Sequence, residues 1–141
     1  MGVNIKQNAD GSAGLQGVDL DDGPITILVF NYNSLLTSLT QTVGVMQRKM
    51  VVKAIYHRPD VVSSNAVTAT LYNTPNGTAP SGGVALHTGS CNLQGTVNTN
   101  VELTLVAAAA PILADSAIGV IISGAVGAVG AGSISVHLCP A

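Results

Sequence analysis

The chain has 141 residues, of which only 9% are Asp, Glu, Lys or Arg, against about a quarter in an average soluble domain. Its net charge of −2 excludes a general electrostatic attraction to nucleic acid or to an anionic membrane. The two cysteines, Cys91 and Cys139, are too few for a disulfide framework. A surface this poor in charge favours a protein that lies against a partner, so assembly is the first hypothesis for its function.

Residues 1–23 are polar and rich in Gly, and they carry an acidic cluster of Asp19, Asp21 and Asp22. This composition predicts an extended N-terminal arm. The first residues are not followed by the apolar core of a signal peptide, so synthesis in the cytoplasm is expected. Residues 24–141 contain no linker and predict one β domain, because runs of β-branched side chains alternate with turns of Gly, Pro and Asn.

Within this domain, residues 25–30 predict a first strand and residues 31–34 a polar connection, while residues 35–45 fit either a short strand or an irregular connection. Residues 46–57 predict a longer strand that ends at Arg58-Pro59-Asp60, because proline cannot donate to a ladder. Alternation along this strand predicts two faces, one with Met50, Val52, Ala54 and Tyr56 and the other with Lys49, Val51, Lys53, Ile55 and His57.

The second half of the domain predicts short strands at regular spacing. They fall at residues 66–72, 83–91, 101–106, 118–122 and 133–138, and the sequence NTPNGT at residues 73–78 predicts a turn. Residues 117–131 are apolar, but they fall short of the roughly 20 residues of a membrane helix and contain several glycines, so buried strands are predicted there. The pattern indicates an antiparallel sandwich or barrel of seven or eight strands.

The sequence contains no nucleophile-elbow, P-loop, dinucleotide-binding or HExxH motif, and no two acidic residues have a spacing that marks a general acid and base. No catalytic, cofactor-binding or metal-binding residue is therefore predicted. One alternative is a zinc site of two cysteines and two histidines, which would require the strand of His87 and Cys91 to pair with the strand of His137 and Cys139. Neither pair has the spacing typical of structural zinc sites.

Four of the five basic residues lie close together in the sequence: Arg48, Lys49, Lys53 and Arg58. One interpretation is a solvated strand face. Another is an electrostatic contact, either with an acidic partner surface or with Asp19, Asp21 and Asp22 of a neighbouring copy. Nucleic acid is a third interpretation, which the scarcity of aromatic residues and the net negative charge do not favour.

The second half contains five motifs: AVTATL at residues 66–71, PNGTA at 75–79, GSCNLQGTVNT at 89–99, ADSAIGV at 114–120 and SISVHL at 133–138. Taken together, these motifs resemble those of small β-sandwich capsid cement (decoration) proteins of tailed bacteriophages. The resemblance covers about residues 48–141. It implies an all-β, jelly-roll-like sandwich of about eight strands that binds the outside of an icosahedral capsid and has no catalytic residues.

The function expected from this resemblance is that of a structural virion protein that cements neighbouring subunits of the major capsid protein. The expected partners are the major capsid protein and other copies of the chain, with a dimer as the simplest assembly. No nucleic acid, membrane or small-molecule substrate is expected. The alternatives are a tail- or receptor-associated β-sandwich binding module, and a small β-fold enzyme or lectin.

Overall fold

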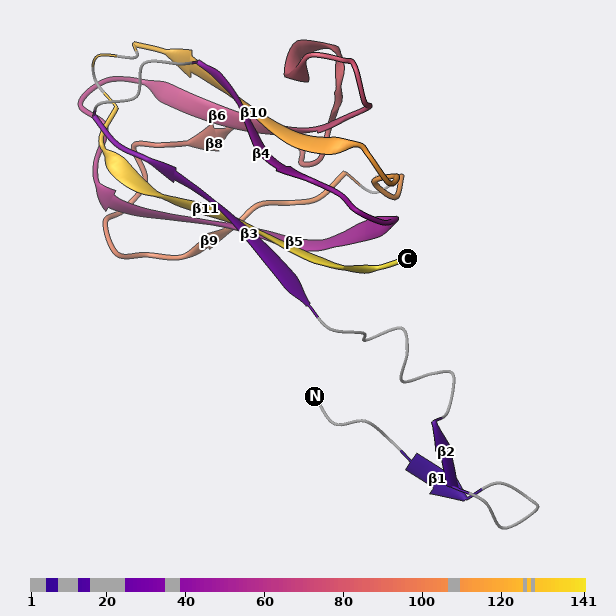
Figure 1. The fold of residues 1–141 in the computed structure, drawn as a ribbon. Coiled ribbons are helices and arrows are strands. Elements are labelled where there is room, and N and C mark those ends of the chain that lie inside the picture. The colour runs from indigo at the N-terminus through magenta and orange to yellow at the C-terminus, as the bar shows by residue number, and fades with distance from the viewer. Residues whose placement is uncertain are drawn as a thin grey trace.

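Two antiparallel sheets that face each other form the body of the protein, as the ribbon of the computed structural model shows (Figure 1). The structure describes residues 5–7, 13–15, 25–34, 39–106, 110–125, 127 and 129–141. The first sheet has the strand order β4-β10-β6-β7, with β8 also paired to β6, and the second has the order β3-β11-β5-β9. The prediction of an all-β antiparallel sandwich is thus confirmed.

The strands of the first sheet are β4 (Thr40–Val45), β6 (Val67–Thr74), β7 (Val84–Ala85), β8 (Cys91–Asn92) and β10 (Ala117–Gly124). The strands of the second sheet are β3 (Thr26–Tyr32), β5 (Met50–Val61), β9 (Val101–Glu102) and β11 (Ala131–Pro140). A short 3-10 helix, η2 (Pro80–Gly82), lies between β6 and β7.

The connections between the strands follow a jelly-roll order. The chain passes from one sheet to the other at each step from β3 to β6, stays in the first sheet for β7 and β8, and then changes sheet again for β9, β10 and β11. Since β7 and β8 both pair with β6, they occupy one strand position that is interrupted in the middle. Eight positions in two sheets of four are the pattern of a jelly roll.

The core between the sheets is almost entirely aliphatic. Alternation on β11 buries Ile134, Val136 and Leu138 completely and leaves Ser133 and Ser135 half-buried on the opposite face. Each such aliphatic side chain contributes about 1.5–3 kcal/mol when it leaves water. The core therefore reaches its volume with few aromatic residues, as the 3% aromatic content requires.

Strand β5 differs from its prediction because it contains a bulge at Lys53. On β11, His137 pairs with Ala54 while Leu138 pairs with Val52, so Lys53 has no opposite residue. An extra residue exchanges the two faces of the strand from that point on. Consequently Ile55 and His57 are buried in the interior, and the prediction that Tyr56 shares a face with Met50 is wrong.

The same strand does not end at Pro59, as predicted, but continues to Val61. The Pro59 carbonyl accepts a hydrogen bond from the Asn98 backbone N–H at 2.8 Å, so the backbone edge of Pro59 faces away from β11. On that side β9 pairs only with Tyr56 and His57. No ladder bond is needed from the proline nitrogen, and proline is tolerated at such an edge position.

Two further strand predictions are too long. The predicted strand at residues 83–91 is broken between β7 and β8, and the prediction at residues 101–106 is reduced to β9 followed by an isolated bridge between His87 and Leu105. The first strand is longer than predicted and continues to Tyr32, while the predicted turn is present, with Gly77 at a positive φ of 79°. No helix among the described residues is long and apolar enough to cross a membrane.

Part of the predicted N-terminal arm is described. Strands β1 (Ile5–Gln7) and β2 (Ala13–Leu15) pair with each other in antiparallel fashion. The rest of residues 1–23, including Asp19, Asp21 and Asp22, lies outside the described residues, as does residue 24. The boundary between arm and domain therefore stays a prediction.

Candidate interaction surface

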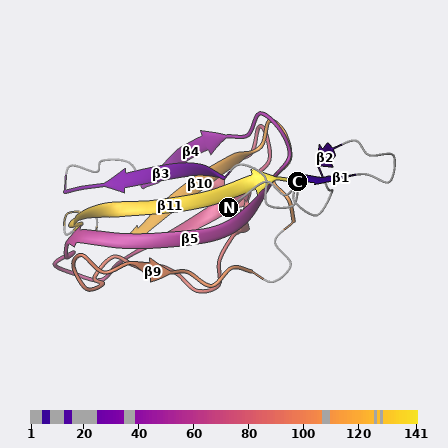
Figure 2. The same ribbon diagram turned by 90° about the horizontal axis from the view of Figure 1, so that it is seen from below.

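The outer face of the second sheet is formed by β3, β11 and β5, and Figure 2 looks onto this side of the ribbon. Three aliphatic side chains at alternate positions are exposed here, one just before β3 and two within it: Ile25, Ile27 and Val29 have exposed fractions of 51%, 52% and 50%. Together they are named the aliphatic stripe. Their alternation with Leu28 and Phe30 is the ordinary period of a strand, because the latter two face the core.

Strand β3 is also the edge of its sheet. Among the described residues, it pairs only with β11, so the other side of its backbone has no partner strand. Edge strands of soluble proteins are commonly protected by Lys, Pro or a bulge. The sequence TILVFNY of β3 has none of these and no charge. The aliphatic stripe therefore lies on an unprotected, uncharged edge.

Beside the stripe, the outer face of β11 and β5 forms a polar groove of about 330 Å³, bordered by Tyr56, Arg58, Asn100, Ser133, Ser135 and His137. The pairing of β11 with β5 brings these residues together. Ser133 lies opposite Arg58, Ser135 lies opposite Tyr56, and both serines are small enough to form a low floor between larger side chains. We call this feature the serine groove.

Side-chain contacts fix the walls of the serine groove. The Arg58 guanidinium donates from Nη1 to Asn100 Oδ1 at 3.1 Å. The ring of His137 meets the ring of Tyr56 edge-on, with centroids 5.1 Å apart, and His137 Nε2 lies 3.4 Å from Ser135 Oγ. The groove thus combines one cation, one aromatic wall and several hydroxyl or amide groups.

The structure does not gather the four predicted basic residues into one patch. All four are exposed, but Arg48 and Lys49 precede β5, Lys53 forms its bulge, and Arg58 lies near its far end. From the start of β5 to Arg58 the distance is roughly 25 Å at about 3.3 Å per residue. Only Arg58 belongs to the serine groove. Whether the others meet the acidic cluster stays a prediction, because Asp19, Asp21 and Asp22 are not described.

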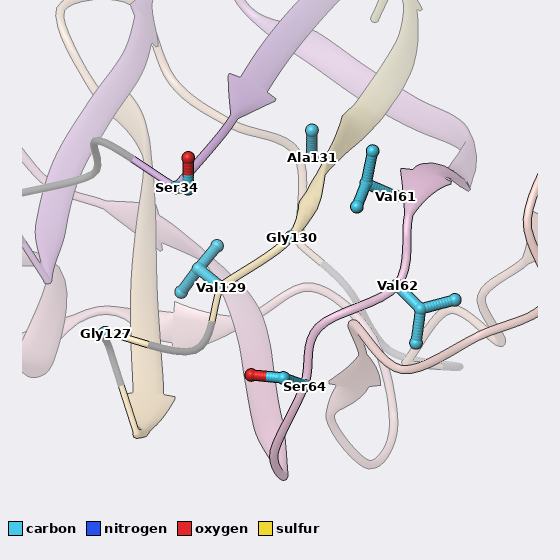
Figure 3. A pocket seen from close by; sticks show the side chains of 8 residues that line it. All are labelled: Ser34, Val61, Val62, Ser64, Gly127, Val129, Gly130 and Ala131. Carbon is cyan, nitrogen blue, oxygen red and sulfur yellow. The ribbon is translucent and has the colours of Figure 1, made fainter.

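A second hollow, of about 500 Å³, lies beside Arg48. Leu28, Val45, Met46 and Met50 give it apolar walls, and Arg48 is its one charged lining residue among the described part of the chain. A third and smaller hollow of about 200 Å³ is shown in Figure 3, where Val61, Val62 and Val129 border it together with the hydroxyls of Ser34 and Ser64. Neither combines a cation with an aromatic side chain.

The predicted alternative of a zinc site is wrong, because the two residue pairs lie in different sheets. Cys91 belongs to β8 in the first sheet, with His87 in the chain just before it, whereas His137 and Cys139 belong to β11 in the second. Within the described ranges, no group of three or more His, Cys, Asp or Glu side chains is placed to hold a metal ion. Burial also raises the pKa of the Cys91 thiol to about 12, so this cysteine is a protonated core residue.

Two histidines are buried, one associated with each sheet. Tyr32 Oη and His57 Nε2 form a buried hydrogen bond at 2.7 Å, and burial raises the pKa of the Tyr32 phenol and keeps it protonated. The Leu71 backbone N–H donates to His87 Nε2 at 3.1 Å, while His87 Nδ1 is buried with no hydrogen-bond partner in the structure. Burial lowers the pKa of both histidines and outweighs an opposing backbone interaction at Thr88 in the case of His87. Both are therefore neutral structural residues of the core.

The described carboxylates do not form a reactive pair. Asp60 lies on β5, Glu102 on β9 and Asp115 in the turn before β10, and all three are exposed. No protein-family model, no curated protein and no solved structure matches this chain. The surface itself therefore carries the functional argument.

Sequence reasoning identified Arg58 as an interaction residue but missed the rest of the serine groove. Asn100, Ser133 and Ser135 are ordinary polar residues in the sequence, and only the pairing of β11 with β5 brings the serines beside Arg58 and Tyr56. Residues 25–30 are predicted as a strand from the sequence. Which of their side chains are exposed cannot be predicted without the position of β3 at the edge of its sheet.

Proposed function

We propose that this protein is a structural component of a bacteriophage particle that binds the outside of the capsid and cements neighbouring subunits of the major capsid protein, without catalysis. The observation that carries the proposal is the aliphatic stripe on β3. Three large aliphatic side chains, each half exposed on an uncharged edge strand, leave apolar surface in water that a partner would cover.

The chemistry of the chain supports this proposal. Binding to a shell draws its free energy from apolar area removed from water, at about 25 cal/mol per Å² before the costs of association. Small residues such as Gly, Ala, Ser and Val lose little side-chain entropy on burial. A chain with 9% charged residues therefore pays a low desolvation penalty when its surface is covered.

The free edge of β3 offers a second kind of contact. An extended segment of a partner that adds to this edge would form main-chain hydrogen bonds, while the aliphatic stripe would pack against its side chains. The jelly roll alone does not select this function, since one fold hosts many activities. Among the structural roles, we propose the capsid one because the sequence motifs of residues 48–141 led to that expectation.

The proposal is tested by the composition of virus particles. Cells that carry the gene are induced for phage production, and the particles are purified by density gradient and analysed by quantitative mass spectrometry. We expect the protein as a high-copy component that cosediments with the major capsid protein and that remains after nuclease and detergent washes. Its absence from particles that contain the major capsid protein would refute the proposed function.

A further inference from the structure

The serine groove lies on the same outer face as the aliphatic stripe but differs from it in chemistry. Val29, in the stripe, is opposite Ser135 of β11, and Ser135 is in turn opposite Tyr56 of β5. The apolar contact proposed for β3 uses none of the polar groups on β11 and β5. A hollow of about 330 Å³ is within the lower part of the range, roughly 300–1,000 Å³, in which proteins bind small molecules.

The Arg58 guanidinium makes one side-chain hydrogen bond at the rim of the groove and has further donors. Asn100 Oδ1 accepts one of its N–H groups, and no carboxylate among the described residues forms an ion pair with it. A guanidinium carries five N–H donors in a planar fork that matches a carboxylate. The side chain therefore presents oriented donors to an anionic group that enters the groove from solvent.

The remaining walls fit a hydroxyl-rich body attached to that anion. The hydroxyls of Ser133 and Ser135 on the floor both donate and accept hydrogen bonds, as the hydroxyl groups of a sugar do. The Tyr56 ring, supported edge-on by His137 at 5.1 Å, supplies an apolar surface for ring C–H groups. A lone anion would leave the serines and Tyr56 unused, and a neutral sugar would leave Arg58 unused.

We propose that the serine groove binds a single carboxylate-bearing sugar unit, with the carboxylate on Arg58, the sugar hydroxyls on Ser133 and Ser135, and the sugar ring against Tyr56. The chemistry is binding without bond cleavage. The site does not depend on the capsid-binding role, because it uses a different part of the outer face. It would give a particle-bound or free protein the ability to hold acidic polysaccharide.

The test is a titration of the full chain followed by NMR chemical shifts, with D-glucuronate, D-glucose and acetate as the three probes. We expect saturable shifts for glucuronate at Tyr56, Arg58, Ser135 and His137, and binding at least about tenfold weaker for glucose and for acetate, a difference of about 1.4 kcal/mol. Equal affinity for acetate would show an isolated carboxylate site and overturn the proposal, as would the absence of saturable binding by glucuronate.

Two variants assign the binding to the groove. Arg58→Ala removes the cation from an exposed position and is expected to weaken glucuronate binding at least about tenfold, whereas the matched control Arg48→Ala, on an exposed arginine outside the groove, leaves binding unchanged. Ser135→Val keeps the charge but fills the floor, and it should also weaken binding. Unchanged binding in both Arg58→Ala and Ser135→Val would overturn the assignment.

Discussion

The two sheets of the sandwich treat their outer faces differently. On the first sheet, the turn at η2 packs against β10 at one position: Gly119 faces away from the core and is nevertheless buried, and a Cβ atom there would lie 2.6 Å from Pro80 Cγ. On the second sheet, Ser135 holds the comparable position on β11 and is only half-buried. Among the described residues, the chain thus covers the outer face of the first sheet at Gly119 and leaves the comparable position of the second sheet half-exposed.

The largest expected effect on stability comes from placing valine at the outward position of each sheet, Gly119 in the first and Ser135 in the second. Gly119→Val should lower the free energy of unfolding by about 1–3 kcal/mol, because the new side chain must displace Pro80 and meets Thr74 Oγ1 at 3.1 Å. Ser135→Val, at the open position, should change it by no more than about 0.5 kcal/mol. Urea unfolding of both variants gives the two values, and equal costs would contradict the difference between the faces.

A smaller effect is expected at the buried histidine of the open sheet. Tyr32→Phe removes the hydroxyl that is hydrogen-bonded to His57 Nε2 and leaves a buried polar ring nitrogen without a partner, which should cost about 1–2 kcal/mol of unfolding free energy. Tyr56→Phe serves as the control, because Tyr56 points outward on the same sheet. If the midpoint temperature of thermal unfolding changes equally in the two variants, the hydrogen bond of Tyr32 makes no specific contribution to stability.

Acid should weaken both sheets through their buried histidines. The unfolded chain binds protons at His57 and His87 near pH 6.5, whereas burial lowers the pKa of both in the folded chain. The unfolded state therefore binds more protons just below pH 6.5, and the free energy of unfolding should fall as the pH falls from that value. Chemical unfolding at a series of pH values measures the slope.

The half-exposed His137 provides the control for this pH dependence. His137→Gln should keep the slope of the wild-type chain, because the buried pair is unchanged. A wild-type protein whose stability is constant from about pH 6.5 to pH 5 would contradict the neutral, hydrogen-bonded state assigned to His57 and His87.

The alternation of residues was enough to predict the fold class but not the faces of every strand. The runs at residues 118–122 and 133–138 lie within β10 and β11 because both central strands keep a strict period of two. In β5 the bulge at Lys53 reverses the period, and no residue near it announces a bulge in the sequence. Pro59 was misleading because its effect depends on which neighbour its backbone faces, and that is a property of the sheet.

The candidate surface was harder to predict than the fold for the same reason. Arg58 stood out as a charge in a nearly uncharged chain, but the four basic residues, close in sequence, are spread along a strand. The serines of the groove became significant only through their register with β5. A site that is built from residues on different strands has no local sequence pattern. It can therefore be predicted only when the pairing of the strands is known.

The smallest expected effect concerns the basic residues at the start of β5. Replacing Lys49 and Lys53 by Gln should weaken assembly modestly, and the difference from wild type should shrink as salt is added, because exposed charges are screened. Sedimentation velocity at low and high salt measures the change. If the double variant assembles like wild type at low salt, these lysines do not take part in a contact with an acidic partner or with the acidic cluster of another copy.

The most direct test of the central claim compares particles made with wild-type protein and with Ile27→Lys/Val29→Lys protein. Both side chains are about half exposed, so the variant should stay folded and lose no more than about 1–3 kcal/mol of unfolding free energy, which circular dichroism and urea unfolding verify. We predict that wild-type protein is a high-copy component of purified particles and that the variant is largely lost from them. Full occupancy by the folded variant would contradict the claim that the open face of β3 is the contact surface.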